Sequence, residues 1–166
     1  MYERYQLDVA AFLERDRSGP CFICQIVARH SDYPAHILYE DATAIVFLDK
    51  YPPEYGWTLV APREHREQVT GDFSVDAYLA LQRVVYWVSE AVHQGRRRTD
   101  LSLLVGAQPG QCTYALAVAP APQGMPFHEQ GPGIFRANRL HIPEEDLLAL
   151  AARLRLCLKH SLTSDY

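Results

Sequence analysis

Two kinds of side chain alternate at every second position through residues 111–120, a pattern typical of a β-strand with two different faces. One face carries bulky side chains, whereas the other carries Ala115, Ala117 and Ala119. A row of such small side chains leaves a groove. The groove is either a packing surface for a helix or the floor of a ligand pocket, and the pattern alone leaves both interpretations open.

Four further segments rich in β-branched and aromatic residues predict the other strands of a sheet. They cover residues 37–39, 44–48, 57–61 and 101–105. Turn-forming residues separate the first three of these segments, which indicates an antiparallel meander. Together with residues 111–120, the expected sheet has five strands.

Apolar residues at helical spacing predict the helices. The longest helix begins after a cap at Asp72 or Ser74 and ends near His93. Shorter helices are expected over residues 5–14, from Cys21 to an end near the polar residues 30–32, and after Pro143. Residues 122–133 are rich in glycine and proline and should form a loop. The predicted fold class is α+β: a five-stranded antiparallel sheet with one long helix packed on it, short N-terminal helices and a C-terminal helix.

The size and composition of the chain fit one globular domain. The chain has 166 residues, of which 48% are hydrophobic and 22% charged, enough to bury a core. We expect a single domain over residues 1–166, with its core at about 21–123, an N-terminal arm at 1–20, and a C-terminal loop and helix at 124–166.

The charge and hydropathy of the chain exclude some partners. A net charge of −4 does not favour binding to nucleic acid or to an anionic membrane surface. No apolar run approaches the roughly 20 residues of a membrane-spanning helix. The N-terminal residues also lack the basic and then apolar layout of a secretory signal. We therefore expect a cytoplasmic protein with no nucleic-acid or membrane partner.

The chain contains four cysteines, and their spacing is informative. Cys21 and Cys24 form a C-x-x-C motif, whereas Cys112 and Cys157 are isolated. A chain of this length without an export signal does not need disulfides, so we expect reduced thiols. One helical turn separates Cys21 from Cys24, so both sulfur atoms can point at one place.

Five short motifs, taken in order, resemble those of the histidine triad (HIT) superfamily. They are residues 21–26 (CFICQI), 39–41 (YED), 46–49 (VFLD), 56–65 (GWTLVAPREH) and 110–114 (GQCTY). The resemblance implies the five-stranded sheet with its long helix, and a homodimer formed across that helix and a strand edge. It also implies nucleotide binding, with transfer or hydrolysis of nucleotidyl groups.

The three histidines that give this superfamily its name correspond to Ala115, Ala117 and Ala119. In active relatives the middle histidine attacks the α-phosphorus, and the methyl group of Ala117 has no lone pair for that attack. The resemblance therefore implies no catalytic residue, and the family's nucleotidyl hydrolase or transferase chemistry is predicted to be absent. Three neighbouring positions also depart from the family pattern: Cys112, Gln123 and residues 105–107.

Several interpretations of these alanines stay open. Natural loss, which the neighbouring departures favour, gives a pseudoenzyme or a repurposed module that binds a nucleotide or another small molecule. Engineered replacement of all three histidines gives a knockout of an active enzyme. New chemistry is a further alternative, with Cys112 as nucleophile and His128 as base in a pocket beside Tyr114 and Glu129. A last alternative is an interaction protein whose groove is filled by its own loop at 124–133.

The resemblance implies zinc as the cofactor, because relatives with a C-x-x-C motif use it to bind zinc. The ligands carried over are Cys21, Cys24 and His65, and Ala115 replaces the family's fourth ligand. Zinc would then keep an open position, filled by water, a substrate or His128. The alternative is that both cysteines are small core residues and His65 is a strand-end residue.

The resemblance also implies a nucleotide pocket. Asp49 corresponds to the carboxylate that accepts hydrogen bonds from ribose hydroxyls, although capping of the preceding strand is an alternative role. Gln111 is expected to donate to a phosphate oxygen, beside Cys112. The remaining ligand-binding residues form the apolar walls around the base: Phe22, Ile26, Leu38 and Phe47.

Overall fold

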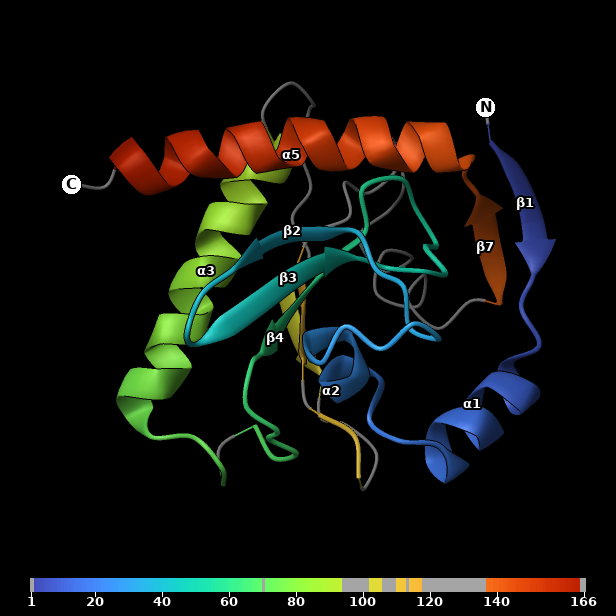
Figure 1. The fold of residues 1–166 in the computed structure, drawn as a ribbon, viewed down its shortest axis with the longest axis horizontal. Coiled ribbons are helices and arrows are strands. Elements are labelled where there is room, and N and C mark those ends of the chain that lie inside the picture. The colour runs from blue at the N-terminus through green and yellow to red at the C-terminus, as the bar shows by residue number, and fades with distance from the viewer. Residues whose placement is uncertain are drawn as a thin grey trace.

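A computed structural model describes residues 2–69, 71–93, 102–105, 110–112, 114–117 and 137–164 (Figure 1). The strands are β1 (Glu3–Gln6), β2 (Ile37–Glu40), β3 (Ala44–Leu48), β4 (Thr58–Pro62), β5 (Ser102–Val105), β6 (Tyr114–Ala117) and β7 (Asn138–His141). The helices are α1 (Val9–Ser18), α2 (Phe22–Val27), α3 (Val75–His93) and α5 (Glu144–Ser164). None of these helices is long and apolar enough to cross a bilayer.

Five strands form the central sheet in the order β2-β3-β4-β6-β5, and every neighbouring pair is antiparallel. The predicted five-stranded antiparallel sheet with a long helix is therefore confirmed. In this register Ala115 lies opposite Val60, and Ala117 lies opposite Thr58. Two of the three alanine positions thus lie beside β4, while Ala119 falls outside the described residues.

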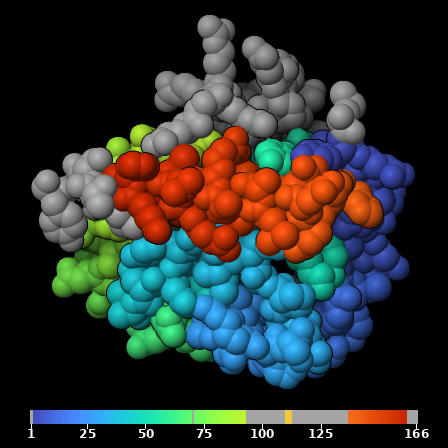
Figure 2. Space-filling view, turned by 45° about the horizontal axis from the view of Figure 1, so that its top comes forward, coloured from blue at the N-terminus to red at the C-terminus, as the bar shows by residue number. Residues whose placement is uncertain are grey.

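Helices α3 and α5 cover one face of the sheet (Figure 1). Residues from β2, β3 and β4 pack there against apolar residues of both helices: Leu38, Ala44, Val46, Leu48 and Val60 against Leu81, Val84, Val85, Val88, Leu150, Leu154 and Leu158. Figure 2 shows α5 lying along the segment that contains β2, with which it is in contact. This larger core is the main stabilising layer, because burial of apolar surface is the dominant favourable term in folding.

The opposite face of the sheet carries a second core beneath α2. It consists of Cys21, Ile23, Ile26, Ile45, Phe47, Trp57, Leu59, Ala61 and Cys112. Every residue of β3 and β4 is buried, since neighbours cover both faces of these strands. The C-x-x-C motif is therefore held against the middle of the sheet.

The N-terminal arm differs from the prediction. We expected one helix over residues 5–14, but Glu3–Gln6 form β1, which pairs with β7, and α1 begins only at Val9. Asp8 caps α1 by accepting a hydrogen bond from the Ala11 N–H. All four residues of β1 are exposed, so no hydrophobic alternation marks the strand, and its partner lies far along the chain.

The long helix begins as predicted, and the structure selects between its two candidate caps. The Ser74 hydroxyl accepts a hydrogen bond from the Ala77 N–H and is therefore the cap of α3. The Asp72 carboxylate instead accepts from the N–H groups of Glu67 and Gln68 and fixes the loop before the helix. The loop predicted at residues 122–133 lies outside the described residues.

Candidate metal centre

Three segments bring four metal-binding side chains together. Cys21 is the N-cap residue of α2, and Cys24 follows one turn later on the same side of the helix. His65 comes from the loop after β4, and Cys112 lies just before β6. The donor atoms of all four side chains lie within 4.8 Å of one another. All four cysteines of the chain are free thiols, as predicted.

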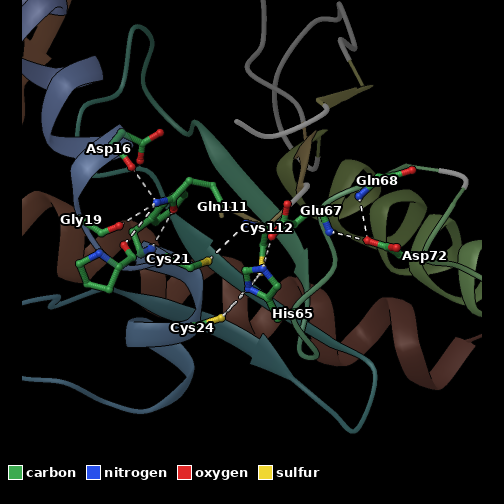
Figure 3. Close-up of polar contacts among 12 residues, drawn as sticks. Asp16, Gly19, Cys21, Cys24, His65, Glu67, Gln68, Asp72, Gln111 and Cys112 are labelled. Carbon is green, nitrogen blue, oxygen red and sulfur yellow. Dashed lines mark hydrogen bonds and ion pairs between the residues drawn. The ribbon is translucent and has the colours of Figure 1, made fainter. Parts of the chain in front are cut away.

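The His65 ring points one nitrogen toward two of the sulfur atoms (Figure 3). Its Nδ1 atom is 3.2 Å from Cys24 Sγ and 3.2 Å from Cys112 Sγ. The two sulfur atoms are 3.8 Å apart. The backbone N–H of Cys112 lies 3.3 Å from Cys21 Sγ, to which it donates. One nitrogen and three sulfur atoms therefore converge on one point.

This geometry fits a tetrahedral zinc ion. With Zn–S bonds of about 2.3 Å and a Zn–N bond of about 2.0 Å, sulfur atoms lie about 3.8 Å apart, and sulfur and nitrogen about 3.5 Å apart. The contacts of His65 with Cys24 and Cys112 are close to these values. Because four protein ligands leave no open position, the set matches structural rather than catalytic zinc sites.

Cys112 changes the predicted ligand set. We expected Ala115 to leave the fourth position open, and we placed Cys112 in the ligand pocket. In the structure, the Cys112 thiol lies in the metal cluster with Cys21, Cys24 and His65. Cys112 precedes β6, and it lies three positions before Ala115, where the family has its fourth ligand. The Cys112 thiol therefore takes the place of the missing histidine. The signal available in the sequence was a further cysteine close to the expected ligand.

The three thiols of the cluster differ in acidity. Hydrogen bonding from the Cys112 thiol, helped by the backbone N–H groups of Cys24 and Cys112, lowers the pKa of Cys21 against the opposing effect of burial. The Cys21 thiolate in turn raises the pKa of Cys112, and burial adds to this effect. Burial also raises the pKa of Cys24. Cys21 is thus the most acidic of the three thiols, and a bound cation would displace the thiol protons that remain.

Glu67 fixes the orientation of the histidine. Its Oε1 atom lies 3.1 Å from His65 Nε2, the ring nitrogen that faces away from the sulfur atoms. This hydrogen bond raises the pKa of His65, and the same bond lowers the pKa of Glu67. A carboxylate on the second nitrogen is the usual support of a metal-bound histidine, because it leaves the other nitrogen free to bind the metal.

The predicted base-binding walls do not all lie on one side of the sheet. Phe22, Ile26 and Phe47 pack in the core beneath α2. Leu38 belongs to the opposite core with α3 and α5, so this packing does not support a pocket shared with the other three, and its role in binding a base stays a prediction. Its neighbour Ile37 lies against the α2 core, because successive strand residues face opposite sides.

Asp49 follows β3 directly, as expected. Its Oδ1 atom accepts a hydrogen bond of 2.9 Å from the Tyr51 N–H, which is the local capping role considered above. Burial raises the pKa of the Asp49 carboxyl, and the Tyr51 N–H and the nearby Arg139 guanidinium offset this only in part. Binding of ribose hydroxyls by Asp49 stays a prediction.

Gln111 makes its contacts within the protein. Its side chain is buried, and both ends of the amide bond to the backbone of residues 16–22. The expected hydrogen bond from this amide to a phosphate stays a prediction, and the amide is already engaged in this structure.

The alternative in which Cys112 is a nucleophile is not favoured. Cys112 is fully buried, and its raised pKa keeps the thiol protonated, whereas a nucleophilic cysteine needs an accessible thiolate. Its proposed base, His128, lies outside the described residues, as do Gln123 and Glu129.

Sequence comparisons place the chain among HIT-like proteins. No family model matches the chain. An uncharacterised HIT-like protein of Borreliella burgdorferi is 26% identical over 144 residues, which cover 82% of this chain and 96% of the relative. An uncharacterised HIT-like protein of Saccharolobus solfataricus is 31% identical over 96 residues, which cover 57% of this chain and 67% of the relative.

Structural comparisons agree on the fold. A hypothetical histidine triad nucleotide-binding protein from Sulfolobus tokodaii matches with a TM-score of 0.64 and 24% identity over 84% of this chain and 93% of its own. A zinc-bound histidine triad family protein from Mycobacterium smegmatis matches with a TM-score of 0.64 and 20% identity over 88% of this chain and 97% of its own. With these relatives, the fold and the order of the motifs, the chain belongs to the histidine triad (HIT) superfamily.

Proposed function

We propose that this chain is a HIT-fold nucleotide-binding protein that has lost histidine-based nucleotidyl transfer and uses a Cys₃His zinc centre as a structural element. The convergence of Cys112 with Cys21, Cys24 and His65 is the observation that carries the zinc centre of this proposal. We also infer that the whole chain forms one domain. In support, β1 pairs with β7, and Arg4 bonds to Pro53 and Glu54 in the middle of the chain.

The zinc centre is supported by its donor set. Thiolate and imidazole groups are preferred zinc ligands, and four of them close the coordination sphere. When bound, zinc would link α2, the loop after β4 and the segment before β6. The solved Mycobacterium smegmatis structure is itself zinc-bound, which is consistent with zinc in this superfamily.

Loss of the family reaction follows from the alanines. Ala115 and Ala117 occupy β6 beside β4, and with Ala119 they correspond to the three histidines. A methyl group cannot form a phosphorus–nitrogen bond, and removing a covalent nucleophile costs several orders of magnitude in rate. The protein would therefore bind its ligand without cleaving it.

Among possible ligands, a nucleotide is the class that the family relationship supports best. The Sulfolobus tokodaii relative is described as nucleotide-binding, and Asp49 follows β3 at the position expected for a ribose contact. A calorimetric titration with AMP, using the zinc-loaded full chain, tests this proposal. We expect binding of AMP and no release of AMP from a phosphoramidate or a dinucleoside polyphosphate. No heat with AMP would contradict the binding function, and turnover would contradict the loss of chemistry.

We also propose a homodimer formed through α3. Val75, Leu79 and Tyr86 are 74%, 54% and 59% exposed, although all three are large hydrophobic residues. Spacings of four and eleven residues place them on one face of the helix, away from the core. A second copy of this chain would cover that face, and the sheet edge at β5 lies free of a further strand in the described sheet.

A further inference from the structure

The first turn of α2 receives its cap from a distant part of the chain. The N-cap residue, Cys21, makes no side-chain capping hydrogen bond. Instead, the N–H of Phe22 donates to Gln111 Oε1 over 3.2 Å, across 89 positions of sequence. The first N–H groups of a helix have no partner inside the helix, so this contact satisfies a group that the local sequence leaves open.

The other end of the Gln111 amide holds the segment before the motif. Nε2 donates to the Asp16 carbonyl over 2.8 Å, with longer contacts of 3.5 Å and 3.4 Å to the carbonyls of Gly19 and Pro20. The residue is only 3% exposed, so these bonds form away from water. The Gln111 amide therefore forms hydrogen bonds with the backbone on both sides of Cys21.

Cys112, the residue after Gln111, also contacts Cys21. Cys112 donates its backbone N–H to Cys21 Sγ and contributes its own thiol to the cluster. Figure 3 shows the Gln111 side chain beside Cys21, with Cys112 between that side chain and His65. Two consecutive residues thus contact the same short segment, one through its side chain and one through its backbone.

We propose that Gln111 is a positioning residue of the metal centre, which caps α2 in place of Cys21 and so leaves the Cys21 thiol for the metal. A capping serine or aspartate uses its own side chain to satisfy the first turn. A thiolate at the N-cap position that binds a metal cannot also accept hydrogen bonds from the first turn of the helix. The acceptor that caps the helix then has to come from another segment of the chain. The proposal rests on the zinc centre proposed above.

The test replaces the amide by an apolar side chain of similar shape, Gln111→Met. In the reduced, metal-free full chain, hydrogen exchange of the Phe22 amide should rise about tenfold or more, because its acceptor is gone. Zinc affinity, measured by competition with a chromophoric chelator, should fall about 10- to 100-fold, the usual effect of losing a supporting residue. Thiolate-to-cobalt absorption of the cobalt-loaded variant should also weaken.

A matched control separates positioning from general stability. Tyr39→Phe removes the 2.8 Å hydrogen bond to Asp41 on the edge strand β2, and Tyr39 packs against the core with α3 and α5, on the opposite face of the sheet from the metal cluster. This substitution should lower stability while leaving zinc affinity and the cobalt spectrum unchanged. If Gln111→Met does not fold, Gln111→Glu replaces it. That variant keeps the acceptor for Phe22 and removes the donor to Asp16, so it should protect the Phe22 amide yet bind zinc more weakly than the wild type.

The outcomes separate this proposal from the proposed function. Unchanged exchange at Phe22 overturns the capping role whether or not zinc binds. Raised exchange with wild-type zinc affinity overturns the positioning role. A wild-type chain that binds no zinc overturns the metal centre and with it the positioning role, and it is recognised by the wild-type titration alone. Raised exchange together with weakened zinc binding and an altered cobalt spectrum supports the proposal.

Discussion

The Nδ1 atom of His65 lies 3.2 Å from the Sγ atom of Cys112, a residue 47 positions further along the chain. This contact joins the loop after β4 to the segment before β6 on the same side of the sheet. It converts a three-ligand arrangement into a closed set of four. A closed set favours a structural metal and leaves no coordination position for a substrate.

The first prediction concerns Cys112. Cys112→Ser should lower zinc affinity by at least about tenfold, because a hydroxyl is a far poorer zinc ligand than a thiolate. The wild type should retain one zinc per chain after dialysis, as measured by metal analysis, and the variant should retain much less. Thermal stability of the variant should then no longer rise on addition of zinc.

Cys157→Ser is the matched control for this experiment. Cys157 is a free thiol on α5, packed against the core formed with α3, and it lies outside the cluster. This substitution should leave zinc content unchanged. Equal zinc content in Cys112→Ser and Cys157→Ser would show that Cys112 is not a ligand.

The second prediction concerns the support of His65. Glu67→Gln should weaken zinc binding about tenfold, since a neutral amide orients the ring less firmly than a carboxylate. Glu64→Gln is the control, because the Glu64 side chain is 76% exposed and pairs with Arg66 instead. Chelator competition measures both variants. A loss of affinity in Glu64→Gln as large as in Glu67→Gln would point to loop charge rather than to the hydrogen bond.

Sequence patterns located the elements that have a buried face. The strands around Val46 and Val60 are short runs rich in apolar residues between turn signals, and they are buried on both faces. The helix after Ser74 instead repeats apolar residues at helical spacing. The strand β1 shows neither pattern, because all its residues are exposed and its hydrogen bonds depend on β7. The pairing of β1 with β7 joins segments far apart in the sequence, so the pattern of residues within either segment does not reveal it.

The candidate site was predictable in part for a related reason. Cys21, Cys24 and His65 occur in motifs whose spacing is fixed by one helix and one strand end. Cys112 lies in the GQCTY motif, but at a position that departs from the family pattern, so the motif does not mark it as a metal ligand. Its place in the cluster depends on the register of β6 against β4. Leu38 was expected beside Phe47 from the family resemblance alone, whereas the structure places it in the core with α3 and α5, and the register of β2 against β3 shifts between Ile37 and Tyr39. A motif match does not contain such a shift.

The third prediction concerns stability in acid. Burial raises the pKa of the Asp41 carboxyl, but the N–H groups of Ala44 and Thr43 and the hydroxyls of Thr43 and Tyr39 outweigh it, so the pKa lies below the usual 3.8. A lowered folded-state pKa contributes stability above the unfolded value, and that stability is lost as pH falls through the folded value. The wild type should therefore lose stability below about pH 4.

Asp41→Asn isolates this contribution. The variant should be less stable than the wild type by about 1 kcal/mol at neutral pH, because charge-assisted hydrogen bonds become neutral ones. The difference should shrink as pH falls through the acid range. Urea unfolding at several pH values measures it, and Asp32→Asn, at a side chain that is 78% exposed, is the control. A difference between wild type and Asp41→Asn that stays constant with pH would contradict the assignment.

The last prediction concerns the exposed face of α3. Leu79→Glu should convert the proposed dimer to a monomer, because a carboxylate buried between two copies of the chain costs several kcal/mol unless it is paired. The residue is 54% exposed, so the folded monomer should tolerate the charge. Leu156→Glu, at an α5 position that is 60% exposed, is the matched control and should stay dimeric. Analytical ultracentrifugation of the zinc-loaded proteins distinguishes the cases. A monomeric wild type would contradict the dimer, and dissociation by Leu156→Glu alone would move the interface to α5.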